Sequence, residues 1–349
     1  MITKIACLPV AGNQNPYQYL MIKGLNESNI INAFNGFDDR FFGIVKTWKK
    51  YKPNYIHFDW IHSYYVRRQL WMTILLLPLF IFQVLFIRYC TKTKIVWTLH
   101  NIMPHNTSSY KLNKFVRSFF ARNCYWIRVF SSSTALKASK LFNIKQEKFR
   151  TVPEGDYVSI YPNKISTGEA RNYFKLNKKD KVFLYLGFIR PYKGLGKLIE
   201  IFNNLDIQNS KLIIAGLARD KVYLDDLKNK IKRLDNKKIM LKNVFIPEND
   251  LQIYYNASDV VILPFSNVEN SGSVIMAMGF SKLIVAPRIG VLNERLKNQK
   301  EYLYKDLATT IKKVISISKD QLKEIGKKNK ESLQKYKWSD FQKQFLNDK

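Results

Sequence analysis

Short apolar runs alternate with longer segments of mixed polarity along most of this chain. Such alternation is typical of β-strands separated by helices, and apolar runs of about 4–8 residues indicate strands that are buried on both faces. Runs of this kind occupy residues 1–9, 55–59, 94–98, 182–186, 211–216, 260–264 and 282–287. The pattern predicts an α/β protein with doubly wound parallel sheets.

The chain has 349 residues, which is enough for two domains that each bury a core. Hydrophobic residues make up 46% of it, and this content indicates a globular protein. We predict a first domain over residues 1–163, a second over residues 164–330 and a final helix over residues 331–349. A hinge is expected around Tyr161 and Pro162.

One segment is far more apolar than the rest of the chain. Residues 71–87 contain no charged side chain and are flanked by Arg67, Arg68 and Arg88. A membrane-spanning helix needs about 20 apolar residues, and a span here would separate two strands that we expect to be neighbours. We therefore expect a helix that packs on the sheet with one side and enters the membrane interface with the other. A fully buried core helix is the alternative.

The chain is strongly basic, with a formal net charge of +31, and this charge is unevenly distributed. Between Trp60 and Gln146 there are thirteen Lys or Arg and no Asp or Glu. Basic runs are commonly no more than solvated surface, but a field of one sign also attracts an anionic membrane or polymer. Because the same stretch holds the most apolar segment, we expect binding to an anionic membrane surface.

The three cysteines, Cys7, Cys90 and Cys124, are odd in number and lack the spacing of metal ligands. They predict neither a disulfide framework nor a zinc site, and they favour a reducing compartment. The first apolar run is too short for a signal peptide and is typical of a first strand. We expect a cytoplasmic protein that lies peripherally on the inner face of the cell membrane.

Two short motifs are suited to a diphosphate. In the first, Gly187 ends a predicted strand, and the loop that follows contains Arg190 and Lys193. In the second, the sequence Asn-Ser-Gly-Ser at residues 270–273 opens an apolar helix, whose N-terminus offers unpaired N–H groups and a partial positive charge. Both motifs follow strands of one sheet, so we expect them together at its carboxyl edge, where they would hold a nucleotide diphosphate.

The two motifs and the segments between them resemble the donor half of the GT-B fold glycosyltransferases, in particular the retaining family 4. The resemblance covers nearly the whole chain and includes the strand and glycine turn at 211–216 and the helix at 251–259. It implies two Rossmann-like domains that face a central cleft and a C-terminal helix that crosses back to the first domain. It also implies a site for the donor diphosphate, formed by Arg190, Lys193, Ser271, Gly272 and Ser273. The donor cleft around that site is expected to include Gly187, Gly216 and Asn270.

The chain departs from the pattern of that family at one place. The commoner form has two Glu, one near the transferred sugar and one at the ribose, and the matching positions here hold Val268 and Met276. Glu269, next to the first of them, is then the candidate carboxylate near the sugar. The resemblance favours retention of the anomeric configuration and implies that no metal ion or other cofactor is needed.

In the first domain, polar and aromatic side chains follow three predicted strands, where parallel sheets form their sites. His100 resembles the His that ends a strand in the family, and it can take a proton from an acceptor hydroxyl or hold the donor sugar. Asp59 is a candidate general base, although an Asp at a strand end is also a common helix cap. The acceptor side is expected to include the other candidates, which are Asn13, Tyr17, Trp60, His62, His105 and Glu154.

These features predict a glycosyltransferase that moves a hexose-type sugar from a UDP- or GDP-linked donor to a lipid-linked saccharide acceptor. Arg190 and Lys193 would neutralise the leaving diphosphate. The implied process is the synthesis of bacterial surface polysaccharide, such as capsule. Two alternatives stay open: a catalytically impaired GT-B assembly partner, for which Met276 is the indication, and a basic protein that binds nucleic acid. No known nucleic-acid-binding motif is found in the sequence, and we expect no nucleic-acid partner.

Overall fold

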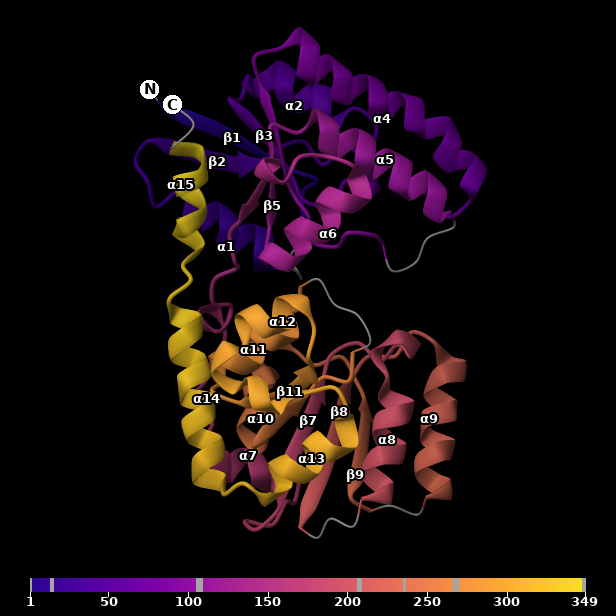
Figure 1. Cartoon of the computed structure of the whole chain (residues 1–349), viewed down its shortest axis with the longest axis vertical. Coiled ribbons are helices and arrows are strands. Elements are labelled where there is room, and N and C mark those ends of the chain that lie inside the picture. The colour runs from indigo at the N-terminus through magenta and orange to yellow at the C-terminus, as the bar shows by residue number, and fades with distance from the viewer. Residues whose placement is uncertain are drawn as a thin grey trace. The chain divides into compact units, whose positions relative to one another are not determined.

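The computed structural model describes residues 2–12, 16–104, 109–205, 209–234, 237–265 and 270–346. The chain forms two compact units, Met1–Gly155 with Tyr336–Lys349, and Asp156–Lys335. Each unit is built on a six-stranded parallel sheet with helices packed against it (Figure 1). The predicted class, α/β with doubly wound sheets, is therefore confirmed. The boundaries expected after residues 163 and 330 both fall within the second unit.

The sheet of the first unit has the strand order β2-β1-β3-β4-β5-β6. Its strands are β1 Thr3–Leu8, β2 Ile31–Asn35, β3 Tyr55–Phe58, β4 Lys94–Thr98, β5 Trp126–Val129 and β6 Phe149–Thr151. Ile5 of β1 pairs with Ala33 of β2 on one side and with Tyr55 of β3 on the other. The order thus reverses between β1 and β3, and open α/β sheets form their binding sites where the order reverses.

The helices of the first unit pack against both faces of this sheet. They are α1 Pro16–Leu25, α2 Gly43–Tyr51, α3 His62–Tyr65, α4 Leu70–Cys90, α5 Tyr110–Asn123 and α6 Ser132–Phe142. Successive residues of β3 face opposite layers, as the period of two in a strand requires. Ile56 and Phe58 join the core with α4, α5 and α6, whereas Tyr55 contacts Phe345 of the C-terminal segment, with 5.0 Å between ring centroids.

The C-terminal segment covers the second face of that sheet. After α14 (Lys319–Gln334) the chain forms a 3-10 turn, Trp338–Gln342, and the short helix α15, Lys343–Leu346, which lies near α1 in Figure 1. The structure differs here from the single helix expected over residues 331–349. The Asp340 carboxylate accepts a hydrogen bond from the Lys337 N–H at 2.9 Å, and this contact starts a new turn instead of continuing α14.

Helix α4 is apolar on both of its sides, one of which faces the core and the other the surface. Its core side includes Leu77, Phe80 and Val84, which are at most 8% exposed. Its other side exposes large apolar side chains, which are Leu70, Trp71, Met72, Ile74, Leu75, Phe82 and Tyr89. Among the described residues it is the one helix long and apolar enough to cross a membrane, and 33% of its most apolar part is buried. A fully buried core helix, the alternative above, is therefore wrong.

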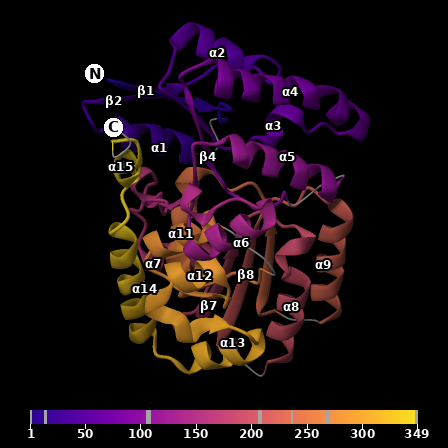
Figure 2. The same cartoon turned by 45° about the horizontal axis from the view of Figure 1, so that its top comes forward.

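The expected neighbours on either side of this helix are confirmed. Strands β3 and β4, which precede and follow α3 and α4 in the chain, pair directly, with Ile56 opposite Ile95. Figures 1 and 2 both show α4 between α2 and α5 in one layer. Helix α4 thus belongs to the fold of the first unit on one side and leaves an apolar surface on the other.

The sheet of the second unit has the order β12-β11-β10-β7-β8-β9 and reverses between β7 and β10. Its strands are β7 Lys181–Leu186, β8 Ser210–Gly216, β9 Ile239–Asn243, β10 Val260–Ile262, β11 Leu283–Pro287 and β12 Leu303–Tyr304. Its helices besides α14 are α7 Thr167–Tyr173, α8 Leu195–Asn204, α9 Lys221–Arg233, α10 Leu251–Ala257, α11 Gly272–Gly279, α12 Gly290–Arg295 and α13 Leu307–Ser316. Figure 2 shows α8 and α9 side by side next to β8.

Candidate functional site

In the second unit, two glycines bring neighbouring strand ends into close contact. Gly187 follows β7 and Gly216 ends β8, with φ of +149° and +146°, which residues with a side chain rarely adopt. A Cβ on Gly216 would lie 1.9 Å from the Gly187 carbonyl oxygen, and a Cβ on Gly187 would lie 3.8 Å from Ser273 Oγ. The ends of β7 and β8 and the start of α11 therefore meet at one corner of the sheet, beside its reversal point.

Cationic side chains border this corner. Lys193 Nζ lies 4.1 Å from the centroid of the Phe265 ring, and burial, followed by the charge of Arg190, lowers the pKa of Lys193 to about 8. The Arg190 guanidinium lies 5.2 Å from the Phe188 ring centroid, and that of Arg219 lies 5.7 Å from the same ring. Arg219 follows β8 much as Arg190 follows β7, and it was not among the predicted site residues.

The start of α11 leaves backbone donors available at the same corner. The Ser271 hydroxyl caps the helix by accepting a hydrogen bond from the Val274 N–H at 3.4 Å. In the described part of the chain, the N–H groups of Gly272 and Ser273 have no acceptor. Uncapped donors at a helix N-terminus suit an anion. Asn270 directly precedes the capping serine.

In the first unit, Asp59, which is buried, and His100, which is partly exposed, form a pair at the carboxyl edge of the sheet. His100 Nε2 lies 3.0 Å from Asp59 Oδ1, and Gln18 Nε2 donates to Oδ2 at 3.1 Å. Burial alone would raise the pKa of the Asp59 carboxyl, but His57 and the hydrogen bonds from His100 and Gln18 bring it below its usual value. A carboxylate engaged at both oxygens holds the imidazole with Nε2–H toward it and leaves Nδ1 as the basic nitrogen. This geometry gives Asp59 a positioning role.

Aromatic rings surround this pair. The Trp60 ring stacks on His100 at 4.9 Å between centroids, and Tyr17 meets both rings edge-on, at 4.7 Å from His100 and 5.9 Å from Trp60. Burial raises the pKa of the Tyr17 hydroxyl, and the charge of Glu154, itself 1% exposed, adds to the rise. The structure thus brings Tyr17, Trp60, His100 and Glu154 into one cluster.

A cavity of about 230 Å³ opens beside the pair. It is lined by Asp59, Trp60, His62, Trp97, His100, Asn101, Pro104 and Arg117. Burial, followed by the charge of Arg117, lowers the pKa of His62 to about 4, so this imidazole is neutral at physiological pH. Arg117 is 5% exposed and donates to the Asn101 carbonyl at 2.7 Å, while its Nε has no partner among the described residues. No local sequence pattern indicated that Arg117 lines a cavity.

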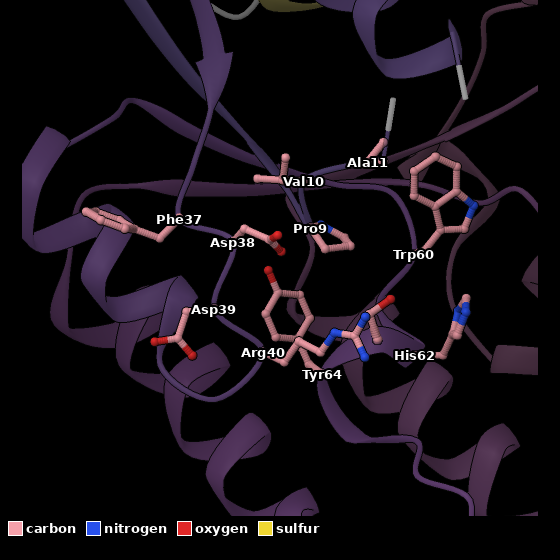
Figure 3. A pocket seen from close by; sticks show the side chains of 12 residues that line it. Pro9, Val10, Ala11, Phe37, Asp38, Asp39, Arg40, Trp60, His62 and Tyr64 are labelled. Carbon is pink, nitrogen blue, oxygen red and sulfur yellow. The ribbon is translucent and has the colours of Figure 1, made fainter. Parts of the chain in front are cut away.

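A second cavity of about 250 Å³ shares Trp60 and His62 with the first (Figure 3). Three segments that follow strands line it: Pro9 to Gly12 after β1, Phe37 to Arg40 after β2, and Trp60 to Tyr64, which includes the start of α3, after β3. Asp38 and Arg40 were missed because the residues of β2 alternate between buried and exposed, so no apolar run pointed to the loop behind it. Tyr64 was missed because it lies within α3, beyond the end of the loop that follows β3.

Three of the expected site residues, Asn13, His105 and Glu269, lie outside the described residues. Among the residues that are described, no three His, Cys, Asp or Glu side chains come together in a way that could hold a metal ion.

Comparison with known proteins finds a family that is similar to most of the second unit. Residues 166–332 match the family described as glycosyl transferases group 1. A GDP-mannose:glycolipid 4-beta-D-mannosyltransferase of Xanthomonas campestris pv. campestris is 21% identical over 56% of this chain and 51% of that protein. An uncharacterized glycosyltransferase of Methanocaldococcus jannaschii is 25% identical over 64% of this chain and 59% of that protein. The chain spans about half the length of these curated relatives.

Solved structures share the fold along nearly the whole chain. Sucrose-phosphate synthase of Thermosynechococcus elongatus superposes with a TM-score of 0.73 at 15% identity, over 99% of this chain and 98% of that chain. Anabaena HepE, in complex with UDP and glucose, has a TM-score of 0.71 at 15% identity, with the same coverage. The chain has the GT-B fold, and its residues 166–332 are similar to the group 1 glycosyl transferases.

Proposed function

We propose that this protein is a glycosyltransferase that moves a hexose-type sugar from a UDP- or GDP-linked donor to a lipid-linked saccharide in bacterial surface polysaccharide synthesis. The observation that carries the proposal is the corner formed by Gly187, Gly216 and the start of α11, with Arg190 and Lys193 at its border. Cations and helix N–H groups stabilise the charge that develops on a leaving diphosphate.

The acceptor side of the proposal rests on the Asp59–His100 pair. With Nε2 held by Asp59, His100 Nδ1 can accept the proton of a sugar hydroxyl as that hydroxyl attacks. Trp60, stacked on His100, offers an apolar ring against which a sugar face can pack. Retention of anomeric configuration remains the favoured outcome, with Glu269 as the carboxylate near the sugar.

The lipid-linked acceptor is supported by a relative and by a surface. The Xanthomonas mannosyltransferase is named as acting on a glycolipid. In this chain, the outer side of α4 exposes Trp71 and Leu75, at 60% and 69%, within a stretch that carries no acid from Trp60 to Gln146. Apolar side chains among cations favour an anionic bilayer. We place the protein on the inner face of the cell membrane, in the cytoplasm.

The proposal is tested by the thermal stability of the purified protein in the presence of UDP, GDP, UDP-hexoses, UDP-N-acetylhexosamines and GDP-mannose. A ligand at a hundred times its Kd stabilises the folded state by about 2.7 kcal/mol, which is a measurable rise in Tm. The rise should be selective for one nucleotide and be lost in Arg190→Ala and Lys193→Ala. The matched control is Lys228→Ala, an exposed lysine on α9. Absence of any rise across the panel would refute the proposal.

A further inference from the structure

One cation, Arg117, lies in the wall of the cavity that adjoins Asp59 and His100. It belongs to α5 and is 5% exposed. Within the part of the chain that the structure describes, Arg117 forms no ion pair, and its Nε has no hydrogen-bond partner. A buried charge without a counter-charge is costly, so an anionic group of a ligand is favoured at this place.

The contacts that Arg117 does make leave its charge uncompensated. NH1 donates to the carbonyl oxygens of Asn101 and Ile102, at 2.7 Å and 3.3 Å. Burial lowers the pKa of Arg117, and the nearby Tyr65 hydroxyl opposes this shift. Burial also raises the pKa of Tyr65, so that hydroxyl is neutral at physiological pH. Arg117 therefore has neutral partners only, and the edge of its guanidinium that carries Nε is left for a planar anion.

Asp59 lines the same cavity, but it does not supply the missing counter-charge. Its Oδ1 is engaged by His100 at 3.0 Å, and its Oδ2 accepts a hydrogen bond from Gln18 at 3.1 Å. Asp59 is not among the groups that shift the pKa of Arg117. After burial, the charge of Arg117 is instead the largest influence that lowers the pKa of His62, another lining residue. The charge of Arg117 therefore acts on the side of the cavity where His62 lies.

The sequence around Arg117 strengthens the attraction for an anion. Arg117 belongs to the stretch from Trp60 to Gln146, which holds thirteen Lys or Arg and no Asp or Glu. A field of one sign raises the local concentration of a ligand of opposite charge. The single charge of Arg117 matches a carboxylate, whereas a phosphate monoester carries about −1.5 to −2 at neutral pH. The chemistry of the cavity thus favours a carboxylate.

We infer that the accepting sugar is a hexuronic acid, whose carboxylate binds Arg117 while one of its hydroxyls meets His100 Nδ1. The cavity of about 230 Å³ is smaller than the pockets of drug-sized ligands, which suits a single sugar ring. The inference rests on the proposed function, because it names the substrate class of the acceptor in that reaction.

The first test compares two sugars that differ in one group. Methyl β-D-glucuronide has a carboxylate where methyl β-D-glucopyranoside has a hydroxymethyl group, and calorimetry measures the binding of each to the full chain. The glucuronide should bind at least about tenfold more tightly, because only it pairs with the buried guanidinium. Equal affinities would overturn the inference, and so would the failure of both sugars to bind.

Variants of Arg117 separate recognition of the carboxylate from support of the loop. In Arg117→Gln the ratio of the two affinities should fall to about one. A residue that only supports the loop would weaken both sugars equally, and an unchanged ratio would therefore overturn the inference. Arg117→Lys keeps a cation and should retain a preference for the glucuronide, which provides the test if Arg117→Gln does not fold. Equal binding of the two sugars by folded Arg117→Lys would also overturn it.

The matched control is Arg122→Gln, which removes an exposed cation from the same helix. Its ratio of affinities should equal that of the wild type. A loss as large as in Arg117→Gln would show that the general positive field, and not one guanidinium, selects the glucuronide. That result would overturn the inference.

Two further measurements locate the sugar and identify the anion. A glucuronide with a benzophenone at its anomeric position should label peptides that contain Trp60, His62 or Asn101 after irradiation, since these residues line the cavity. Labelling confined to other peptides would overturn the inference. Glucose 6-phosphate serves as a third ligand, because tighter binding of it than of the glucuronide would assign the cavity to a phosphate and overturn the choice of a carboxylate.

The two proposals fail in distinguishable ways. Nucleotide stabilisation depends on Arg190 and Lys193 in the second unit, whereas the preference for a glucuronide depends on Arg117 in the first. Loss of the preference alone removes the acidic acceptor and leaves the transferase. Loss of nucleotide stabilisation alone removes the transferase and leaves a site for an acidic sugar.

Discussion

At the scale of single residues, Lys193 predicts a pH dependence of nucleotide binding. Burial, followed by the charge of Arg190, lowers its pKa to about 8. A diphosphate binds the protonated ammonium, so affinity is highest below the pKa and falls as the pH rises through about 8. We expect the Kd of the stabilising nucleotide, measured by calorimetry, to rise several-fold between pH 7 and pH 9.

The matched variant is Lys193→Arg, which keeps its charge over this whole range. Its Kd should change little between the same two pH values. An equal rise in the wild type and in the variant would assign the pH dependence to another group.

The contact between Asp59 and His100 predicts that a substitution of Asp59 slows turnover. In Asp59→Asn the amide no longer enforces the Nε2–H form of His100, and we expect kcat to fall by about 10²- to 10⁴-fold. KM for the donor should stay within about twofold, because the donor groups lie in the second unit. If Asp59 acts through His100, the double variant Asp59→Asn/His100→Ala is no slower than His100→Ala alone. Multiplied losses would show that Asp59 acts independently.

Which site residues the sequence reveals depends on where they stand in the chain. Asp59, His100 and Arg190 each follow an apolar run, so the rule that parallel strands end at one edge was enough to find them. Gln18 and Arg117 lie within helices and reach the site through packing alone. No local pattern distinguishes such positions from ordinary helix residues.

At the scale of elements, the two sides of α4 predict opposite results for similar truncations. Phe80 is 1% exposed in the core, and Phe80→Ala should lower the free energy of unfolding by about 3–5 kcal/mol. Leu75 is 69% exposed, and Leu75→Ala should change it by no more than about 0.5 kcal/mol. Urea unfolding of the two variants gives the comparison. A loss of several kcal/mol in Leu75→Ala would mean that its side of the helix is covered in the folded protein.

Burial of the side chains on both faces decides which strands could be predicted from the sequence. Strands β7 and β8 are buried almost throughout, so they form apolar runs that stand out in the sequence. Strand β2 lies at the edge of its sheet and alternates between buried and exposed residues, which leaves no run. Strand β5 contains Arg128, which is 1% exposed because its guanidinium stacks 4.2 Å from the Phe341 ring. A partner more than two hundred residues away cannot be inferred from the strand itself.

At the scale of the whole molecule, the order of apolar runs and helices along the chain predicts the fold class more readily than it predicts the functional site. Alternating runs and helices were sufficient for two doubly wound sheets. The sites instead depend on where the strand order reverses, between β1 and β3 and between β7 and β10. That order fixes which loops meet, and it brings the loop of Asp38 and Arg40 next to the loop of Trp60. Which loops meet therefore depends on how strands that are distant in the sequence pair, and local sequence does not determine that pairing.

The packing of the C-terminal segment predicts how a truncation near the end of the chain changes the stability of the first unit. Phe341, near the end of the chain, packs against His57 of β3 and Trp126 of β5, with ring centroids 5.5 Å and 5.8 Å apart. It is 1% exposed, and Phe341→Ala should cost about 3–5 kcal/mol. Because the segment belongs to the first unit, that cost should appear in hydrogen exchange as faster exchange of the β3 and β5 amides, with those of β7 and β8 little changed. Faster exchange confined to the second unit would place the segment's stabilising contacts there instead.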